Sequence, residues 1–346
     1  MAEEKSSKKQ AKYTSKDLKR LQSYPLWRKV QITKSRILEF QKEFENKTYI
    51  SFSGGKDSTV LLHIAREVNP NIPAVFVDTG LEYPEVRNFA LSQENVIKLK
   101  PKMSFREVVD KYGYPLISKE TANNIEYARK ALEHGNEKMY HRYVDGTRIG
   151  KRDGKEYKFS ALSKLGFSIL ESNIKVSSRC CYIMKKSPCR KYEKDTGRKP
   201  ITGIMADEST VRKQNWMAYG CNIFEGNHPR SNPMSFWTEQ DVLQYIATHN
   251  LPYTSVYGEI KQDENGSYYT TGCKRTGCYA CLFGVHKESE PNRFQLLHKT
   301  HPKIWEFCMR DLNDRGLGEK RILEFMGVET GENETDTENQ NSMSNL

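Results

Sequence analysis

The stretch Ser53-Gly54-Gly55-Lys56-Asp57-Ser58 decides the predicted fold of this chain. It follows an apolar run at 49–52, typical of a buried strand, and precedes the run 59–65, typical of the first turns of a helix. The two glycines let the backbone turn sharply between them. The first N–H groups of a helix lack partners within the helix, and its dipole favours negative charge there. The stretch therefore predicts an anion-binding turn.

The side chains of this stretch fit such a site. Lys56 supplies a cation for a phosphate, Ser53 and Ser58 supply hydroxyl donors, and Asp57 is a candidate ligand for a metal ion or a water. The spacing differs from the Gly-x-x-x-x-Gly-Lys-Ser/Thr pattern of Walker A loops. The alternative is a plain Gly-Gly turn that binds no ligand.

The string Ser-Gly-Gly-Lys-Asp-Ser resembles the PP-loop of ATP pyrophosphatases, which split ATP between the α and β phosphates; residues 53–58 are called the PP-loop below. The resemblance implies ATP or another adenylyl nucleotide as the ligand and Mg²⁺ as a cofactor. It also implies Lys56 and Asp57 as catalytic residues, with Ser53, Gly54, Gly55 and Ser58 completing the phosphate cradle.

A second strand-to-helix unit follows the first. The apolar run 73–77 ends at Asp78 and Gly80, and Pro84 is typical of the first turn of a helix. Two such units in succession predict an α/β fold with a parallel sheet, in which ligands bind beyond the carboxyl ends of the strands. Asp78 lies at such an end and is a candidate for binding ribose, adenine or magnesium. A turn or helix N-cap aspartate is the alternative.

The remaining chain is divided by composition and periodicity. Helices are predicted in 15–45, at 104–112, 119–134 and 238–246 and within 291–326, a strand at 95–100, and a basic loop at 141–165. We expect a disordered basic N-terminus at 1–14, a helical extension at 15–45 and a PP-loop nucleotide-binding domain at 46–250. A Cys-x-x-Cys loop with C-terminal helices is expected at 251–328, and a disordered acidic tail at 329–346.

The composition limits the class of protein. The formal net charge of +11 indicates either a solvated basic surface or a polyanionic partner such as nucleic acid. Basic residues of the extension, Arg28, Lys29, Lys34 and Arg36, pose the same choice. No run reaches the roughly 20 apolar residues of a membrane span, and the first residues lack the apolar segment of a signal peptide. We therefore expect a cytoplasmic protein with no membrane partner.

Two close cysteine pairs stand far apart in the sequence. Cys180 and Cys181 are adjacent, and Cys278 and Cys281 form a Cys-x-x-Cys pair. Four thiolates brought together by the fold suit a tetrahedral zinc ion or a [4Fe–4S] cluster. Adjacent cysteines are unusual for structural zinc, whose paired ligands are spaced by two to four residues. Buried cysteines acting as small hydrophobes are the third alternative.

The cysteine pattern resembles the iron–sulfur pattern of assimilatory adenylyl-sulfate reductases. The segment from Gly203 to Arg212 is similar to that family's Gly-x-Arg-x-x-x-Ser-x-x-Arg segment, although Met205 stands where Arg is usual. Residues 232–242 resemble its Asn-Pro-Leu-x-x-Trp-Thr-x-x-Asp-Val segment. On this basis the chain is identified as a member of the phosphoadenylyl-sulfate reductase family of the PP-loop superfamily.

The resemblance implies a specific fold and site. The fold is a Rossmann-like parallel sheet with flanking helices of the adenine nucleotide α-hydrolase type, with a Cys-rich cluster-binding region. A [4Fe–4S] cluster would be held by Cys180, Cys181, Cys278 and Cys281. Gly203 and Arg212 would contact the nucleotide; for Arg212 a surface ion pair is the alternative.

Two departures from the reductases point to ATP chemistry. The chain lacks their Glu-Cys-Gly-Leu-His motif, and Cys308 lies instead in an amphipathic helical pattern. Its PP-loop also keeps Lys56, Asp57 and Ser58. An intact PP-loop with an iron–sulfur cluster resembles the sulfur-transfer branch of the superfamily. That implies an adenylylating sulfurtransferase acting on nucleic acid, DNA or tRNA, with a sulfur donor such as a cysteine desulfurase. A sulfonucleotide reductase and a non-catalytic nucleotide-binding module are the alternatives.

Overall fold

The computed structural model describes residues 11–149, 155–158 and 161–331. These residues form two compact units, each assembled from separate stretches of chain. Unit 1 contains residues 11–78, 82–100 and 187–276, and unit 2 contains residues 79–81, 101–186 and 277–331 with the gaps given above. The domains expected from the sequence, 46–250 and 251–328, are each one continuous range, whereas each unit consists of three stretches. The expected domain boundaries stay a prediction.

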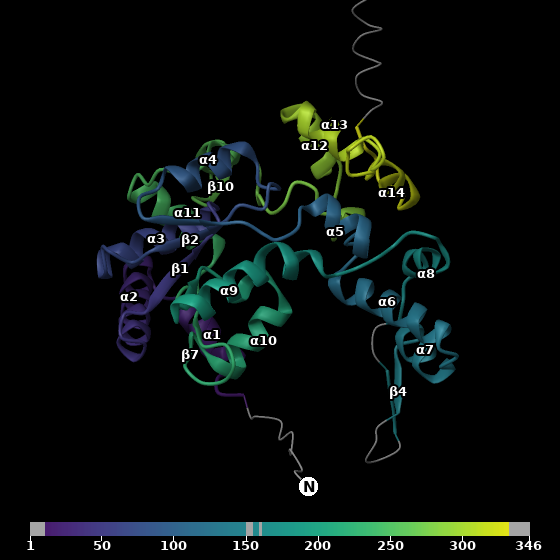
Figure 1. Cartoon of the computed structure of the whole chain (residues 1–346). Helices are drawn as coiled ribbons and strands as arrows, with labels where there is room; N and C mark the ends of the chain where they lie inside the picture. Colours follow the sequence, from purple (N-terminus) through teal and green to yellow (C-terminus); the bar gives the residue numbers. More distant parts are fainter. Residues whose placement is uncertain (1–10, 150–154, 159–160, 332–346) are drawn as a thin grey trace, which may run out of the picture. The chain divides into compact units, whose positions relative to one another are not determined.

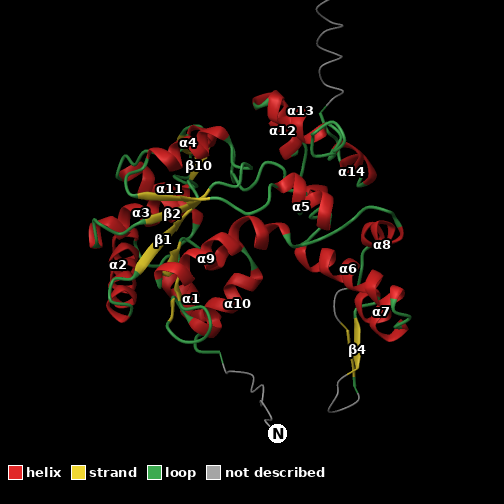
Figure 2. Cartoon of the chain, viewed as in Figure 1, coloured by secondary structure: helices red, strands yellow, loops and turns green. Residues whose placement is uncertain are grey.

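Unit 1 is built on a six-stranded sheet in the order β3-β2-β1-β6-β8-β7. Its strands are β1 (Thr48–Phe52), β2 (Ala74–Val77), β3 (Val96–Leu99), β6 (Lys199–Thr202), β7 (Asn222–Ile223) and β8 (Arg230–Ser231). All neighbouring pairs are parallel except β7 with β8. Ile50 of β1 pairs with Ala74 on one side and Ile201 on the other. The expected parallel α/β sheet is confirmed (Figure 2).

Helices surround this sheet and bury its apolar side chains. They are α1 (Ser15–Gln22), α2 (Leu26–Glu43), α3 (Lys56–Val68), α4 (Pro84–Ser92), α9 (Ser187–Thr196), α10 (Thr210–Tyr219) and α11 (Glu239–Thr248), with the short 3₁₀ turns η2 (Ala206–Glu208) and η3 (Ser255–Tyr257). Helix α3 packs against α2 and α11 (Figure 1). The core includes Ile50, Leu61, Phe76 and Trp237, all fully buried. A hairpin of β9 (Ile260–Gln262) and β10 (Tyr268–Thr270) follows η3.

Unit 2 is mainly helical. It contains α5 (Phe105–Tyr112), α6 (Lys119–Glu133), α7 (Glu137–Val144), α8 (Lys164–Glu171), α12 (Arg293–Thr300), α13 (Pro302–Met309) and α14 (Lys320–Phe325), with the π-helical turn η1 (Tyr182–Lys186) and the 3₁₀ turn η4 (Val285–Lys287). Strands β4 (Thr147–Ile149) and β5 (Glu156–Lys158) form a hairpin. None of the helices in the described part of the chain is long and apolar enough to cross a membrane.

Most predicted elements are confirmed, and one expectation needs correction. Residues 141–165 contain the end of α7, the β4–β5 hairpin and the start of α8, where we expected a basic loop. The hairpin strands are short and polar, so they carry no apolar alternation that a sequence pattern could reveal. Residues 11–14 and 329–331 also belong to the folded units: Thr14 caps α1, and the carbonyl of Thr330 accepts a hydrogen bond from Trp305. The rest of both expected tails lies outside the described residues.

A buried ion pair fastens α2 to the remainder of unit 1. The Lys29 ammonium donates to both carboxylate oxygens of Asp241 at 2.7 Å, and its side chain is 3% exposed. Asp241 also accepts from the backbone N–H and hydroxyl of Thr238, the N-cap of α11. Lys29 is therefore a structural residue. It lies neither on a solvated helix face nor where it could contact nucleic acid, the two alternatives expected from the sequence.

Replacing Lys29 by Met should destabilise the protein by roughly 3–5 kcal/mol, because Asp241 would keep a buried charge without a partner. The double variant Lys29→Met/Asp241→Asn should lose less than Lys29→Met alone. Urea unfolding followed by tryptophan fluorescence measures both. Lys34→Met is the matched control: Lys34 pairs with a half-exposed Glu67, so about 1 kcal/mol or less is expected. Equal losses for Lys29→Met and Lys34→Met would contradict the assignment.

Candidate nucleotide site and candidate cysteine site

The PP-loop lies at the point where the strand order of the unit 1 sheet reverses. Strand β1 lies between β2 and β6, and residues 53–55 connect its carboxyl end to α3. In open α/β sheets this reversal opens a crevice beyond the strand ends, where ligands bind. The predicted turn between strand and helix is therefore confirmed, in the position that suits a nucleotide.

The loop conformation depends on a glycine at position 54. Gly54 has φ +74°, and a Cβ there would lie 2.8 Å from the Val86 carbonyl oxygen. The hydroxyl of Ser58 donates to the Gly55 carbonyl at 2.9 Å and lies 3.1 Å from the Ser53 hydroxyl. The N–H groups of Asp57 and Ser58 form no hydrogen bond with any described residue. Two donors at the start of α3 are therefore available to an anion.

The Lys56 side chain is buried inside this site. It is 6% exposed, and its ammonium contacts the Glu239 carboxylate and the Lys274 carbonyl oxygen, each at 2.7 Å. The ammonium also lies 5.1 Å from the centre of the Tyr257 ring. Oxygen atoms surround the ammonium, which is the environment that phosphate oxygens would also provide.

The Asp57 carboxyl group lies in an environment that disfavours its charged form. Its Oδ1 atom is buried and has no hydrogen-bond partner among the described residues. Burial raises the pKa of Asp57 to about 6, and Glu208 and Glu239 act in the same direction, while Lys56 and Arg275 oppose them. A buried carboxylate oxygen without a partner fits the predicted role of holding Mg²⁺, which prefers oxygen ligands.

The other predicted nucleotide contacts have partners within unit 1. A Cβ at Gly203 would lie 3.2 Å from the Asp57 carbonyl oxygen, so a glycine there allows the β6–η2 connection to approach the PP-loop closely. The Asp78 carboxylate accepts two hydrogen bonds from Arg87 Nε and one from Nη2, at 2.9–3.1 Å. Arg212 forms an ion pair with Glu208, the arrangement named above as its alternative. Nucleotide binding by Asp78, Gly203 and Arg212 stays a prediction.

Sequence patterns missed the residues that cover the PP-loop. The Lys56 N–H donates to the Tyr257 hydroxyl at 3.3 Å, and that hydroxyl lies 3.2 Å from the Thr276 hydroxyl. With Glu239 and Lys274, these residues come from α11, η3 and the loop after β10. Local sequence patterns carry no signal for this cover, because Glu239 and Tyr257 lie about two hundred residues from the PP-loop along the chain.

All four predicted cysteine ligands belong to unit 2, and one short segment brings the two pairs together. The backbone of Tyr114 pairs with that of Val176, which precedes Cys180, and Ile117 pairs with Phe283, which follows Cys281. Gly113, with φ +104°, allows the first contact, because a Cβ there would lie only 2.2 Å from the Lys175 carbonyl carbon. Segment 114–117 thus bridges sequences about a hundred residues apart.

The thiols are close enough to interact electrostatically. The Sγ atoms of Cys180 and Cys181 are 4.0 Å apart, and Cys180 interacts electrostatically with Cys278 and Cys281. The hydrogen bond from Cys180 holds the pKa of Cys181 below its usual range, and Lys119 and Lys185 lower it further. Among the described residues no group of three or more His, Cys, Asp or Glu side chains is arranged to hold a metal ion. The donor set itself is the soft thiol set that suits iron–sulfur clusters or zinc.

Two further cysteines have distinct surroundings. Cys273 belongs to unit 1, and its Thr270 neighbour donates to its backbone carbonyl. Cys308 is fully buried in α13, and burial followed by the nearby Glu319 raises its pKa. The amphipathic helix expected around Cys308 is confirmed, and its thiol is packed inside unit 2.

Substituting Asp57 by Asn should stabilise the protein at neutral pH. The folded carboxyl keeps its proton up to pH 6 and the unfolded one releases it near pH 3.8, so the free energy of unfolding falls as the pH rises through this window. At pH 7.5 the variant should be more stable by about 1–3 kcal/mol, a gain that disappears towards pH 4. Urea unfolding across this pH range checks it, with exposed Asp207→Asn as the control. A variant less stable than the wild type at pH 7.5 would contradict the prediction.

Comparison with known proteins supports the family resemblance described from the sequence. A family model described as the phosphoadenosine phosphosulfate reductase domain matches residues 47–162 and 137–282. The sulfate adenylyltransferase subunit 2 of Marinomonas sp. (strain MWYL1) is 26% identical over 236 residues, 65% of this chain and 65% of that protein. The protein of the same name from Shewanella oneidensis is 22% identical over 284 residues, 73% of this chain and 81% of its own length. Against the first of these relatives the chain spans a little under two thirds of the relative's length.

A solved structure is similar as well. The phosphoadenylyl-sulfate (PAPS) reductase from Candida auris, in a phosphate complex, is 15% identical, and the match covers 73% of this chain and 97% of that one with a TM-score of 0.36. That score is too low to add to the assignment, which rests on the family model, whose matched ranges include residues 53–58 and the four cysteines. The chain belongs to the phosphoadenosine phosphosulfate reductase domain family.

Proposed function

We propose that this chain is an ATP-using enzyme that activates its substrate by adenylylation and releases pyrophosphate. The observation that carries the proposal is that the first turn of α3 combines a buried Lys56 side chain with the unpaired N–H groups of Asp57 and Ser58. A buried cation with two free backbone donors at a helix N-terminus is suited to the phosphates of a nucleotide.

The residues support the reaction in the following way. Phosphate oxygens replace the Glu239 carboxylate and the Lys274 carbonyl as partners of Lys56. An oxygen of the acceptor attacks the α-phosphorus, the bond to the α–β bridging oxygen breaks, and pyrophosphate leaves with that electron pair. Lys56 and the N–H groups stabilise the charge that develops on the leaving phosphates. Asp57, with its buried oxygen, would hold the Mg²⁺ that neutralises the same charge.

The four thiols of unit 2 support a second component of the proposal. Cys180, Cys181, Cys278 and Cys281 would hold a [4Fe–4S] cluster, whose chemistry would be to carry the sulfur that replaces AMP on the activated acceptor. Lys119 and Lys185 stabilise thiolate character at Cys181. A protein such as a cysteine desulfurase would supply the sulfur. This assigns the chain to the sulfur-transfer branch of its family.

The acceptor is the point on which two candidate functions differ. The net charge of +11 favours a nucleic acid, DNA or tRNA. The name of the relatives favours sulfate, which would receive AMP directly, with a partner subunit and without a cluster. A sulfonucleotide reductase is less well supported, because the fully buried Cys308 does not suit an attacking thiol.

Replacing Lys56 by Ala should lower pyrophosphate release from ATP about 100-fold or more, since a preorganised charge on the leaving group is lost. The two acceptors are distinguished by whether AMP is incorporated into sulfate or into tRNA while pyrophosphate is released. Lys47→Ala, an exposed lysine of the same unit, is the matched control and should retain activity. Release of inorganic phosphate and ADP, or full activity of Lys56→Ala, would refute adenylylation at this loop.

Anaerobically purified protein should show broad visible absorbance and about four irons per chain. The absorbance should be lost in Cys180→Ala and in Cys281→Ala but kept in Cys189→Ala, whose thiol lies in α9 of unit 1. Iron and acid-labile sulfide analysis provides the stoichiometry. A colourless wild-type protein with one zinc per chain would rule out the cluster and leave sulfate adenylylation as the leading account.

A further inference from the structure

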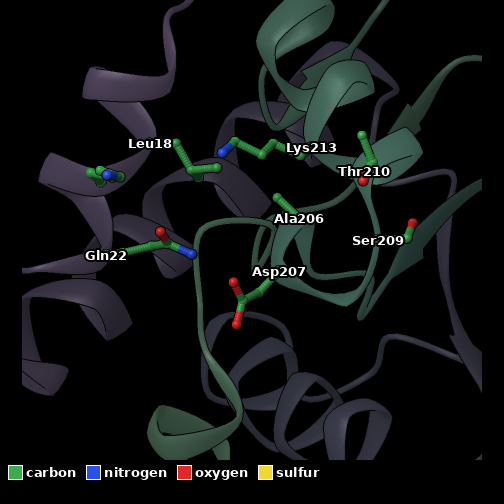
Figure 3. Close-up of a pocket in the computed structure, with 8 residues that line it drawn as sticks. Leu18, Gln22, Ala206, Asp207, Ser209, Thr210 and Lys213 are labelled. Carbon is green, nitrogen blue, oxygen red and sulfur yellow. The ribbon is translucent and has the colours of Figure 1, made fainter.

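A pocket of about 400 Å³ lies between α1 and the η2–α10 segment of unit 1. Helix α1 contributes Leu18, Lys19 and Gln22 to its wall, and the other side includes Asp207, Ser209 and Lys213. Figure 3 shows the Lys213 side chain extending towards Leu18, and Gln22 extending from α1 towards Asp207. It is called the α1–α10 pocket below.

Specific packing holds the two helices around this pocket. The N–H of Tyr13 donates to the Met217 carbonyl at 2.9 Å, and its ring lies 5.1 Å from that of Trp216. A Cβ at Gly220 would lie 2.7 Å from the Tyr13 ring, so glycine there allows the close approach. The pocket is therefore a formed feature of unit 1.

The pocket is suited to an anion. The ammonium groups of Lys19 and Lys213 have no hydrogen bond or ion pair with any described residue, and Asp207 is the one acid among the lining residues. This contrasts with Lys29, Lys34 and Arg36 of α2, whose charges are all paired with carboxylates. Two unneutralised cations in one pocket would be stabilised by a negatively charged ligand.

The chain next to the pocket carries further cations and an exposed aromatic ring. Lys12 and Lys16 are exposed and form no ion pair with the described residues. The Arg28 guanidinium lies 3.9 Å from the centre of the Tyr24 ring, and the neighbouring Trp27 is 67% exposed. Unpaired cations interleaved with accessible aromatic rings are the combination that binds single-stranded nucleic acid, through phosphates and base stacking.

The wall of the pocket also reaches the nucleotide site. Its η2 segment contains Glu208, which interacts electrostatically with Asp57. The preceding Gly203 packs against the backbone of Asp57. A ligand in the α1–α10 pocket therefore lies beside the connection that contacts the PP-loop, within the same unit.

We propose that the α1–α10 pocket and the segment from Lys12 to Arg28 bind the sugar-phosphate backbone of a single-stranded nucleic-acid segment, the acceptor of the adenylylation proposed above. This inference rests on that proposed function. Lys19 and Lys213 contact phosphates, and Trp27 stacks on a base. A series of cations along α1, an exposed tryptophan and a pocket larger than a single oxyanion favour this ligand over free sulfate. Except for Lys213, these residues precede the matched family domain at 47–282, so they are an addition to it.

The test is binding of fluorescently labelled single-stranded RNA and DNA of about 16 nucleotides, measured by anisotropy at several salt concentrations. Lys19→Ala/Lys213→Ala should weaken binding at least tenfold and reduce the slope of log K against log salt by about 1.4, the value for two phosphate contacts on a single strand. Trp27→Ala should weaken binding about fivefold with little change in that slope. Lys42→Ala/Lys194→Ala removes two exposed lysines elsewhere on unit 1 and should change neither quantity by a comparable amount.

Several outcomes would overturn the proposal. One is equal binding by the pocket variant and the Lys42/Lys194 control. Another is sulfate binding, measured by calorimetry with sodium sulfate, that depends on Lys19 and Lys213 while no oligonucleotide binds. ATP binding in the absence of acceptor, measured by calorimetry, should be unchanged in the pocket variant, and thermal melting confirms its fold. Failure of adenylylation appears only in the Lys56→Ala assay, so the two failures are distinguishable.

Discussion

The buried ammonium of Lys56 is the constraint on which unit 1 depends. A cation that is 6% exposed must be surrounded by oxygen atoms, because an unpaired charge in a protein interior is strongly unfavourable. Glu239 at the start of α11 and Lys274 after the β9–β10 hairpin provide these oxygens, although both are about two hundred residues away in the sequence. The packing of α11 and the hairpin over the PP-loop is thus coupled to the chemistry of the loop. A nucleotide that binds Lys56 must compete with these contacts.

In unit 2, backbone pairing places two stretches that carry distant cysteine pairs beside one short segment. Residues 114–117 pair with one neighbouring stretch near Val176 and with another near Phe283. Each pairing fixes the backbone next to one pair of thiols. The placement of these two stretches in one unit depends on backbone pairing that no local sequence pattern records.

The basic charge of the chain is used in two ways. At Lys29, Lys34 and Arg36 of α2 it is neutralised by acids, and the buried pair of Lys29 with Asp241 fastens the helix to the rest of unit 1. At Lys16 and Lys19 of α1 and at Lys213 it remains available for a ligand. The helical extension carries basic residues throughout its sequence. The structure separates them into residues that pair with acids and residues that are available to a ligand.

The sequence by itself determined the strand-to-helix turn of the PP-loop, the parallel α/β class and the capped helices. Those features are local, since they depend on glycines, apolar periodicity and N-cap residues within a few positions of each other. Only the tertiary structure decided that Glu239, Tyr257 and Lys274 cover the loop. It also decided that Arg212 pairs with Glu208, that 141–165 contains a hairpin, and which lysines remain unpaired. These outcomes depend on contacts between residues far apart in the chain, where burial and charge pairing are set by the fold and not by neighbouring residues.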